Sequence, residues 1–195
     1  GCLWATLESK GKATHASQPQ LGENAILKLI RALHRIDTEL APALSHYHHP
    51  VLGRGTANIG TISGGSRTNI VPDFATATVD FRTVPDMIEE IDTFSRVKEF
   101  LEGSGVTIAP SFEYPPMDMP TDHPWLKRLQ SIQPDLKLAG APWFSDAAHL
   151  SDAGLPSICL GPGSIDQAHT ADEFIHIKDL EDGAAWFTKF IQGLA

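Results

Sequence analysis

The order of apolar patterns over the first 113 residues constrains the fold more than any other feature. Segments that alternate apolar and polar residues indicate half-buried strands, and apolar residues at helical spacing indicate amphipathic helices. The predicted elements are a strand ending in a loop at residues 2–17, a helix at 22–40, strands at 56–65 and 75–84, a helix from 85 to the glycines at 103–105, and a strand at 106–114. This β-α-β-β-α-β order is typical of the ferredoxin-like fold, an antiparallel sheet with two helices on one face.

Turn-forming residues separate these elements. The segment "APALSHYHHP" at 41–50 is predicted to end the first helix, and "SRTNIVPDF" at 66–74 to join two strands. A proline-rich segment at 114–120, "YPPMDMP", is predicted to be a linker.

Beyond the linker the pattern changes to helices alternating with buried strands. We expect a helix at 124–132, a weak strand at 136–139, a helix at 144–154 capped by Ser145 or Asp146 and stopped at Gly154, an apolar strand at 155–161, and a helix at 178–192. About 80 residues with two strands are too few for an independent α/β domain. The pattern therefore predicts part of one.

Composition excludes some classes of function. A formal net charge of −9 argues against non-specific nucleic-acid binding. No apolar run approaches the length of a membrane span, and no basic region followed by an apolar core opens the chain, so neither a span nor a secretory signal is expected. Cys2 and Cys159 lack metal-site spacing and are typical of reduced thiols in a cytoplasmic protein.

His169 follows the predicted strand at 155–161, in the loop "GPGSIDQAH". The carboxyl ends of strands in open α/β sheets are where ligands bind, and an imidazole there suits a zinc ligand or a general base. The alternative is a histidine that caps the last helix or only packs. Asp172 and Glu173 either orient the ring or begin the next turn. The chain has no H-x-D or H-E-x-x-H motif, so it offers one metal ligand without the rest of a set.

Three other polar residues are candidates, each with a plain structural alternative. His15 lies in a loop of small residues, where it can face a ligand or another subunit, or simply solvent. Asn69 can donate its amide to a carbonyl oxygen, or serve only in a turn. Arg82 in "VDFRTV" can bind a carboxylate as a fork, or only border the sheet. A serine-type triad is disfavoured because no G-x-S-x-G motif is present.

Three motifs resemble the dinuclear zinc amidohydrolases and peptidases, the family of acetylornithine deacetylase, succinyl-diaminopimelate desuccinylase, the aminoacylases and carboxypeptidase G. The segment "GKATHASQPQLGENAI" resembles the opening of the family's inserted lid domain, and "ISGGSRTNIVPDFATATVDFR" resembles its G-G…N-x-[IV]-P…D-x-R stretch. The third, "SDAAHLSDAGLPSICLGPGSIDQAHTADEFI", is similar to the C-terminal catalytic segment, most of all to that of acetylornithine deacetylases.

The resemblance implies a role for each candidate residue. His169 would be a terminal ligand of the second of two zinc ions, with cobalt or manganese as other possible metals. His15 would reach across a dimer interface to stabilise the oxyanion of the partner's intermediate, assisted by Asn69. Arg82 would bind the substrate's carboxylate, and Phe144 and Ser145 would border the same pocket.

The resemblance also implies the domain organisation. Residues 1–113 would form the lid and dimerisation domain, and residues 114–195 the C-terminal portion of the catalytic domain. The family's H-x-D motif and bridging Asp are not found in this sequence. The adjacent pair Glu89-Glu90 lies on the solvent side of a predicted amphipathic helix, so we interpret it as a charged surface and not as the family's catalytic pair. We therefore expect an incomplete and inactive portion of a homodimeric amide hydrolase that acts on N-acyl amino acids or small peptides. The alternative is a non-catalytic dimerisation or binding module that keeps the lid fold.

Overall fold

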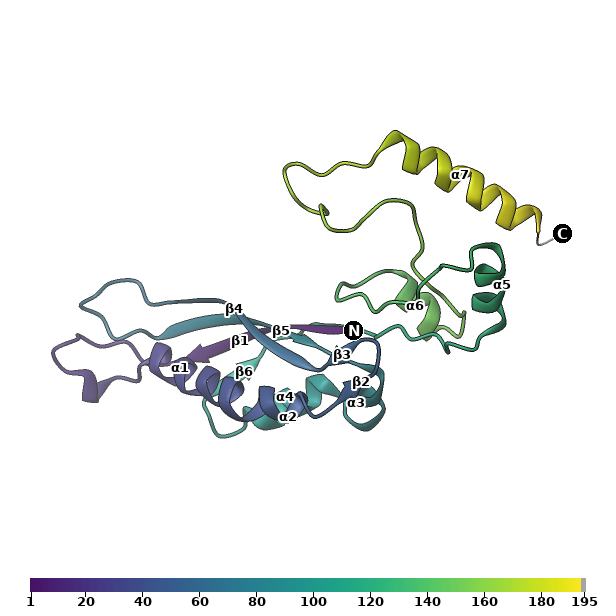
Figure 1. Cartoon of the computed structure of the whole chain (residues 1–195). Coiled ribbons are helices and arrows are strands. Elements are labelled where there is room, and N and C mark those ends of the chain that lie inside the picture. Colours follow the sequence, from purple (N-terminus) through teal and green to yellow (C-terminus); the bar gives the residue numbers. More distant parts are fainter. Residues whose placement is uncertain (194–195) are drawn as a thin grey trace. The chain divides into compact units, whose positions relative to one another are not determined.

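The computed structural model describes residues 1–193 of the chain (Figure 1). The chain divides into two compact units. One unit comprises Gly1–Asp118 together with Ala139–Leu155, and the other comprises Met119–Leu138 together with the residues from Pro156 onward.

The first unit is built on an antiparallel sheet. Its strands are β1 (Cys2–Lys10), β4 (Thr56–Gly64), β5 (Phe74–Arg82), β6 (Val106–Ile108) and β7 (Phe112–Tyr114). They lie in the order β4-β5-β1-β6, and β7 also pairs with β1. Strands β1 and β5 pair along their whole length, from Cys2 opposite Arg82 to Lys10 opposite Phe74. This order and pairing confirm the predicted ferredoxin-like α/β fold.

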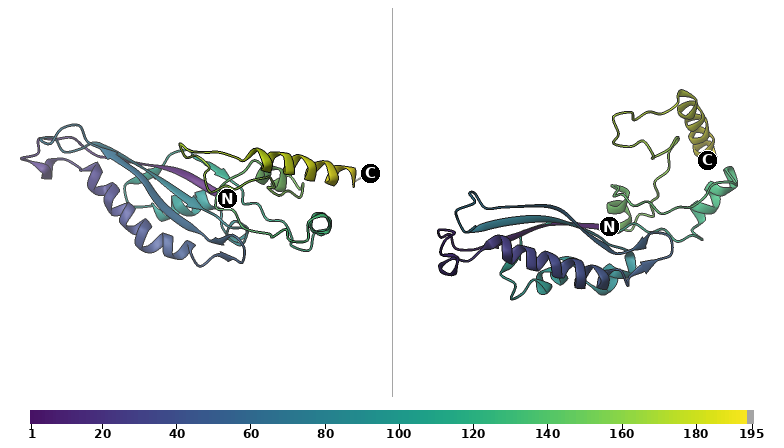
Figure 2. Two further views of the ribbon diagram at one scale, coloured as in Figure 1. Left: turned by 45° about the horizontal axis from the view of Figure 1, so that its top comes forward. Right: turned by 60° about the vertical axis from the view of Figure 1, so that its left-hand side comes forward.

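Helices cover one face of this sheet (Figure 2). The helical segments of the first unit are α1 (Ala25–Arg35), the π-helical η2 (Ile36–Leu40), α2 (Ala41–Leu44), α3 (Pro85–Glu90), α4 (Thr93–Phe100), α6 (Ala147–Asp152) and the 3-10 turn η1 (Pro19–Leu21). A small hairpin that the sequence did not predict, β2 (His48–His49) with β3 (Gly53–Arg54), follows α2.

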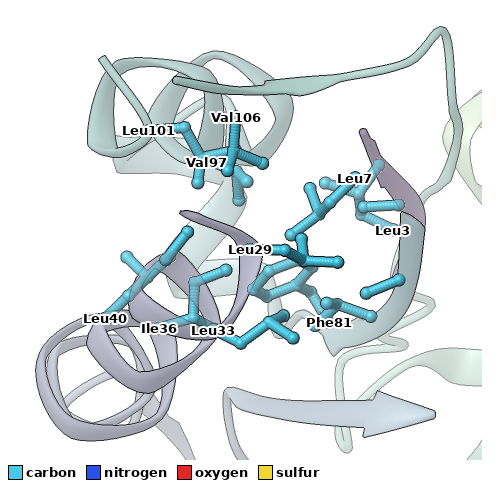
Figure 3. Packing of buried hydrophobic residues seen from close by; sticks show 14 of the residues in the cluster. Leu3, Leu7, Leu29, Leu33, Ile36, Leu40, Phe81, Val97, Leu101 and Val106 are labelled. Atoms are coloured by element: carbon cyan, nitrogen blue, oxygen red, sulfur yellow. The ribbon is translucent and has the colours of Figure 1, made fainter. Parts of the chain in front are cut away.

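The core lies between the helices and the inner face of the sheet (Figure 3). Alternation along β1 and β5 places Leu3, Leu7 and Phe81 on this inner face, where each is fully buried. Leu29 of α1 and Val97 of α4 pack against them from the helical layer. The inward-facing apolar residues of the strands and the apolar face of each helix thus pack together in one cluster.

The first helix extends further than predicted. We expected it to end before Pro42, but the helical path continues through η2 and α2 to Leu44. A proline inside an α-helix clashes with the carbonyl four residues earlier. Here the wider turn of η2 comes just before Pro42, with the Ala41 N–H donating to the Ile36 carbonyl, and the helix is not interrupted.

Two predicted elements are each divided. The helix predicted from residue 85 is interrupted at Ile91, and α4 begins anew where the Asp92 carboxylate accepts a hydrogen bond from the Ser95 N–H at 2.6 Å. The strand predicted at 106–114 separates into β6 and β7 around Pro110, which has no N–H to donate to a sheet.

The second unit contains α5 (Pro124–Ile132) and α7 (Ile177–Gln192), which confirm the helices predicted at 124–132 and 178–192. The strands predicted at 136–139 and 155–161 are absent from the part of the chain that the structure describes. A buried parallel strand needs neighbouring strands to bond its backbone. Every strand within residues 1–193 belongs to the antiparallel sheet or to the small hairpin, so these segments have no such neighbour.

No helix within residues 1–193 combines the length and the apolar character needed to cross a membrane.

Candidate functional site

His15 and Asn69 lie together at one end of the sheet. The loop after β1 pairs with the loop before β5 through an isolated bridge between His15 and Ile70. The Ala16 N–H donates to the Asn69 carbonyl at 3.0 Å, and the Val71 N–H donates to the Thr14 carbonyl at 2.8 Å. Both His15 and Asn69 are exposed. The two loops therefore form one tip that presents both side chains, and we call residues 11–18 and 65–73 the lid tip.

The imidazole of His15 is held in one tautomer. Its Nδ1 lies 2.7 Å from the Ser17 hydroxyl and accepts a hydrogen bond from the Ser17 N–H at 3.2 Å. A nitrogen that accepts from a backbone N–H carries no proton, so in the neutral ring the proton is on Nε2. Nε2–H is then the ring's donor, which is the form that can stabilise an oxyanion.

A pocket of about 580 Å³ lies beside the lid tip. Its lining combines glycine backbone, hydroxyl and apolar groups: Ala16, Pro19, Asn24, Ile26, Gly64, Gly65, Ser66, Arg67, Thr68, Ile70, Val71 and Pro72. Gly65 has a φ of 73°, a conformation that favours glycine and turns the chain out of β4. The Asn24 side chain accepts from the Leu27 N–H and is the cap of α1.

Arg82 lies at the other end of the sheet. Its Nη2 donates to the Asp80 carboxylate at 2.8 Å, and its Nη1 donates to the Pro142 carbonyl at 3.2 Å. The guanidinium is partly buried. These two hydrogen bonds fix the orientation of the guanidinium group. They use two of its five N–H groups, so the others remain able to donate to a carboxylate.

Phe144 and Ser145 lie close to this end of the sheet. The Phe144 ring packs 4.7 Å from the Tyr114 ring and 5.4 Å from the His149 ring, measured between centroids. The Ser145 hydroxyl accepts from the Ala147 N–H at 3.2 Å, just ahead of α6. The helix predicted at 144–154 is shorter in the structure, and its N-cap is Asp146, which makes no side-chain capping bond. The Ser145 O–H remains able to donate.

Cys2 lies beneath this segment. It is opposite both Arg82 and Tyr114 in the register of β1 and is fully buried. Burial raises the pKa of the Cys2 thiol, and the nearby Arg82 guanidinium opposes the effect only in part. Since the thiolate is the nucleophilic form, Cys2 is a packing residue and not a nucleophile.

The structure brings the predicted site residues together in two groups. His15 and Asn69 share the lid tip. Arg82 and Phe144 lie at the other end of the sheet, where β5 ends and β1 begins. Eight residue steps of antiparallel strand separate the two ends, which corresponds to about 27 Å. One small substrate cannot touch both His15 and Arg82 of the same chain.

His169 belongs to the second unit and is exposed. It has a φ of 64°, and its backbone N–H donates to the Glu173 carboxylate at 2.9 Å. The Glu173 carboxylate therefore stabilises the backbone turn at His169 and does not orient the imidazole ring. Within the described residues, no three His, Cys, Asp or Glu side chains gather closely enough to hold a metal ion. These residues alone do not fit a metal centre.

Sequence reasoning missed three residues near Arg82: Asp80, Tyr114 and His149. Asp80 had a readable signal, because residues two apart on a strand share a face and opposite charges there attract. Tyr114 and His149 had none, since their contact joins β7 to α6 across a long stretch of chain.

This antiparallel sheet with helices on one face, and with exposed polar residues on a loop tip, has the architecture of a peptidase dimerisation domain. Residues 1–102 match the family described as the peptidase dimerisation domain of the M20 class. The chain belongs to this peptidase family.

Curated relatives support the same family. A probable carboxypeptidase from Talaromyces marneffei is 32% identical over 206 residues, covering 98% of this chain and 44% of the relative. An acetylornithine deacetylase from Vibrio atlanticus is 31% identical over 173 residues, covering 85% of this chain and 45% of the relative. The chain therefore spans less than half the length of the curated relatives it matches.

Solved structures share the fold. A tripeptidase from Staphylococcus aureus matches with a TM-score of 0.73 and 26% identity over 97% of this chain and 50% of its own. An M20 family metallo-carboxypeptidase from Sulfolobus solfataricus matches with a TM-score of 0.67 and 20% identity over 97% of this chain and 57% of its own. The predicted resemblance to this family is confirmed.

Proposed function

We propose that this chain is part of a metal-dependent amide hydrolase that acts on N-acyl amino acids or small peptides. The observation that carries this proposal is Arg82, whose fork is fixed by Asp80 and by the Pro142 carbonyl while donors remain for a substrate carboxylate. The probable carboxypeptidase and the acetylornithine deacetylase among the relatives support a hydrolase of this kind. In this proposal Phe144 and Ser145 border the substrate beside Arg82.

His15 acts, in this proposal, on a substrate bound by another copy of the chain. The separation of about 27 Å along β5 prevents His15 and Arg82 of one chain from meeting on one small molecule. In a dimer the lid tip can reach the partner's substrate. There His15 Nε2–H donates to the oxygen that becomes negative when the amide carbon is attacked, and the Asn69 amide assists.

A homodimer through the lid domain supplies this second copy. The outer edge of β4 has no strand partner within residues 1–193, and β4 exposes Ile59 and Ile62. Helix α1 adds the exposed Leu27 and Ile30, three residues apart and so on one side of the helix. An unpaired strand edge with apolar side chains beside it suits antiparallel addition of the same strand from a second copy.

Replacing Ile62 with lysine is expected to weaken this dimer. Each dimer would then bury two ammonium groups, so we expect the dimer Kd to rise about 100-fold, because unpaired or like charges at an interface cost several kcal/mol. Analytical ultracentrifugation measures the change. Ile88→Lys on α3, an exposed isoleucine that is not part of β4 or α1, is the matched control. Equal dissociation by both variants would contradict an interface at β4.

His169 is proposed as one ligand of a divalent metal, with zinc expected and cobalt or manganese as alternatives. The third motif and the metallo-carboxypeptidase among the structural neighbours support this. A bound metal of this kind polarises a carbonyl and lowers the pKa of water. The described residues provide a single candidate ligand, so we assign no step of the reaction to the metal.

Arg82→Ala tests the proposed function in the full-length protein. Loss of a charge-assisted fork is expected to raise KM for N-acyl amino acids about 10- to 100-fold and to leave kcat nearly unchanged. Amides or esters of the same substrates, which lack the free carboxylate, should show little change. Arg82→Lys keeps the charge without the fork and should be intermediate. The isolated chain is expected to show no hydrolysis. Full-length protein without any amide hydrolysis would instead favour a non-catalytic module.

A further inference from the structure

Trp4 is a large apolar side chain on the outer face of the sheet, away from the helices. The burial pattern of β1 puts Leu3 and Ala5 in the core and Trp4 outside, where it is 51% exposed. The Tyr114 ring packs edge-on against it, with ring centroids 5.4 Å apart. This contact limits the motion of the indole while much of its surface stays open.

The register places Trp4 next to the Arg82 site. Trp4 lies directly opposite Asp80, the carboxylate that holds the Arg82 fork, and Cys2 lies opposite Arg82 itself. Trp4 and Arg82 are therefore diagonal neighbours on one face of an antiparallel pair. Such neighbours lie about 7–8 Å apart, within reach of long side chains.

We infer that Trp4 is a binding surface for an aromatic or large aliphatic side chain on the substrate residue whose carboxylate binds Arg82. This inference rests on the proposed function of Arg82 and adds the class of substrate. Because Trp4 and Arg82 are diagonal neighbours on one face, an amino acid whose carboxylate binds Arg82 has its own side chain within reach of the indole. A substrate held at Arg82 can thus lay its side chain on the indole.

The charge beside Trp4 defines which substrates this surface disfavours. Asp80 is an acidic residue directly opposite Trp4, so an acidic side chain placed there meets a like charge. A glycine substrate gains nothing from the indole. The expected order of affinity is therefore phenylalanine or leucine derivatives first, then glycine, then glutamate.

The chain offers a matched control on the same face. Phe112 lies directly opposite Trp4 on β7, on the side away from Asp80 and Arg82, and is 76% exposed. Like Trp4, Phe112 is an exposed aromatic residue on the outer face of the sheet. Unlike Trp4, it is not a neighbour of Arg82, because β7 and β5 pair with opposite sides of β1. A general effect of removing an outer-face ring would appear in both positions.

The test measures binding and hydrolysis separately in the full-length protein. Equilibrium dialysis gives the affinity for non-hydrolysable analogues of N-acetylphenylalanine, N-acetylglycine and N-acetylglutamate, and steady-state kinetics gives the hydrolysis of the N-acetyl compounds themselves. Trp4→Ala is expected to weaken binding of the N-acetylphenylalanine analogue about tenfold and to leave that of the N-acetylglycine analogue unchanged, because one apolar contact is worth a factor of this order. Phe112→Ala should change neither affinity. Trp4→Thr, which suits an outer strand position, replaces the alanine variant if that variant does not fold.

The outcomes separate this inference from the function on which it rests. Trp4-dependent preference for N-acetylphenylalanine without hydrolysis would support the binding surface and contradict the hydrolase. Hydrolysis with a phenylalanine-to-glycine preference that is the same in wild type and in the Trp4 variants would overturn the inference and leave the hydrolase standing. An equal loss in Phe112→Ala, or no binding of any of the three compounds, would also overturn it.

Discussion

Replacing His15 with alanine is expected to lower kcat of the full-length protein about 10²- to 10³-fold, the usual cost of removing one oxyanion donor. This expectation rests on the exposed His15, whose Nδ1 is held by Ser17 so that Nε2–H is the ring's donor. KM should change little, because the donor acts mainly on charge that develops in the transition state. Metal content, measured by atomic emission, should be unchanged because His15 is not a proposed ligand.

A mixture of two impaired variants, assayed at substrate concentrations far below KM so that both losses appear, shows whether His15 acts on the partner's substrate. His15→Ala and Arg82→Ala chains, co-expressed, would form mixed dimers in which one site keeps both residues. Activity should return to about a quarter of wild type if half of the dimers are mixed and one site in each is intact. Activity that stays at the level of the separate variants would contradict action across the interface.

Replacing Phe81 with alanine is expected to destabilise the first unit by about 3–5 kcal/mol, the cost of a large cavity in a packed core. Phe81 is fully buried between β5 and the helices, and lies opposite Leu3 (Figure 3). Urea unfolding of the chain, followed by circular dichroism, measures the change in free energy. Phe112→Ala, an exposed aromatic on the same sheet, should cost less than about 1 kcal/mol. Similar losses for both would contradict the assignment of the core.

Most of the first unit could be predicted because its signals are local. Alternation along β1 and β5 and the apolar stripes of α1 and α4 depend on residues close in sequence, and they indicated the correct order of elements. The second unit could not be predicted as well. The segment at 155–161 has the composition of a buried strand, but a strand forms only when neighbouring backbone is available.

The sequence allowed us to predict which residues belong to the candidate site, but not how they are arranged in space. Motifs indicated His15, Asn69 and Arg82, yet no local pattern shows that β5 holds the lid tip and Arg82 at opposite ends. The pairing of Thr14 with Val71, and of Trp4 with Asp80, joins positions far apart in sequence. Such contacts follow from the sheet register, which forms only when the whole sheet forms.

The open edge of β4 has a further consequence for the protein outside its dimer. Among residues 1–193 no strand pairs with the outer edge of the nine-residue β4, and such an edge is a template onto which an extended polypeptide can add, a common route to aggregation. The irregularity between Ile59 and Thr61 bends this edge and disfavours a straight, indiscriminate partner. Self-association would then protect the chain from precipitation as well as complete its chemistry, and the free protomer would be the species most prone to aggregate.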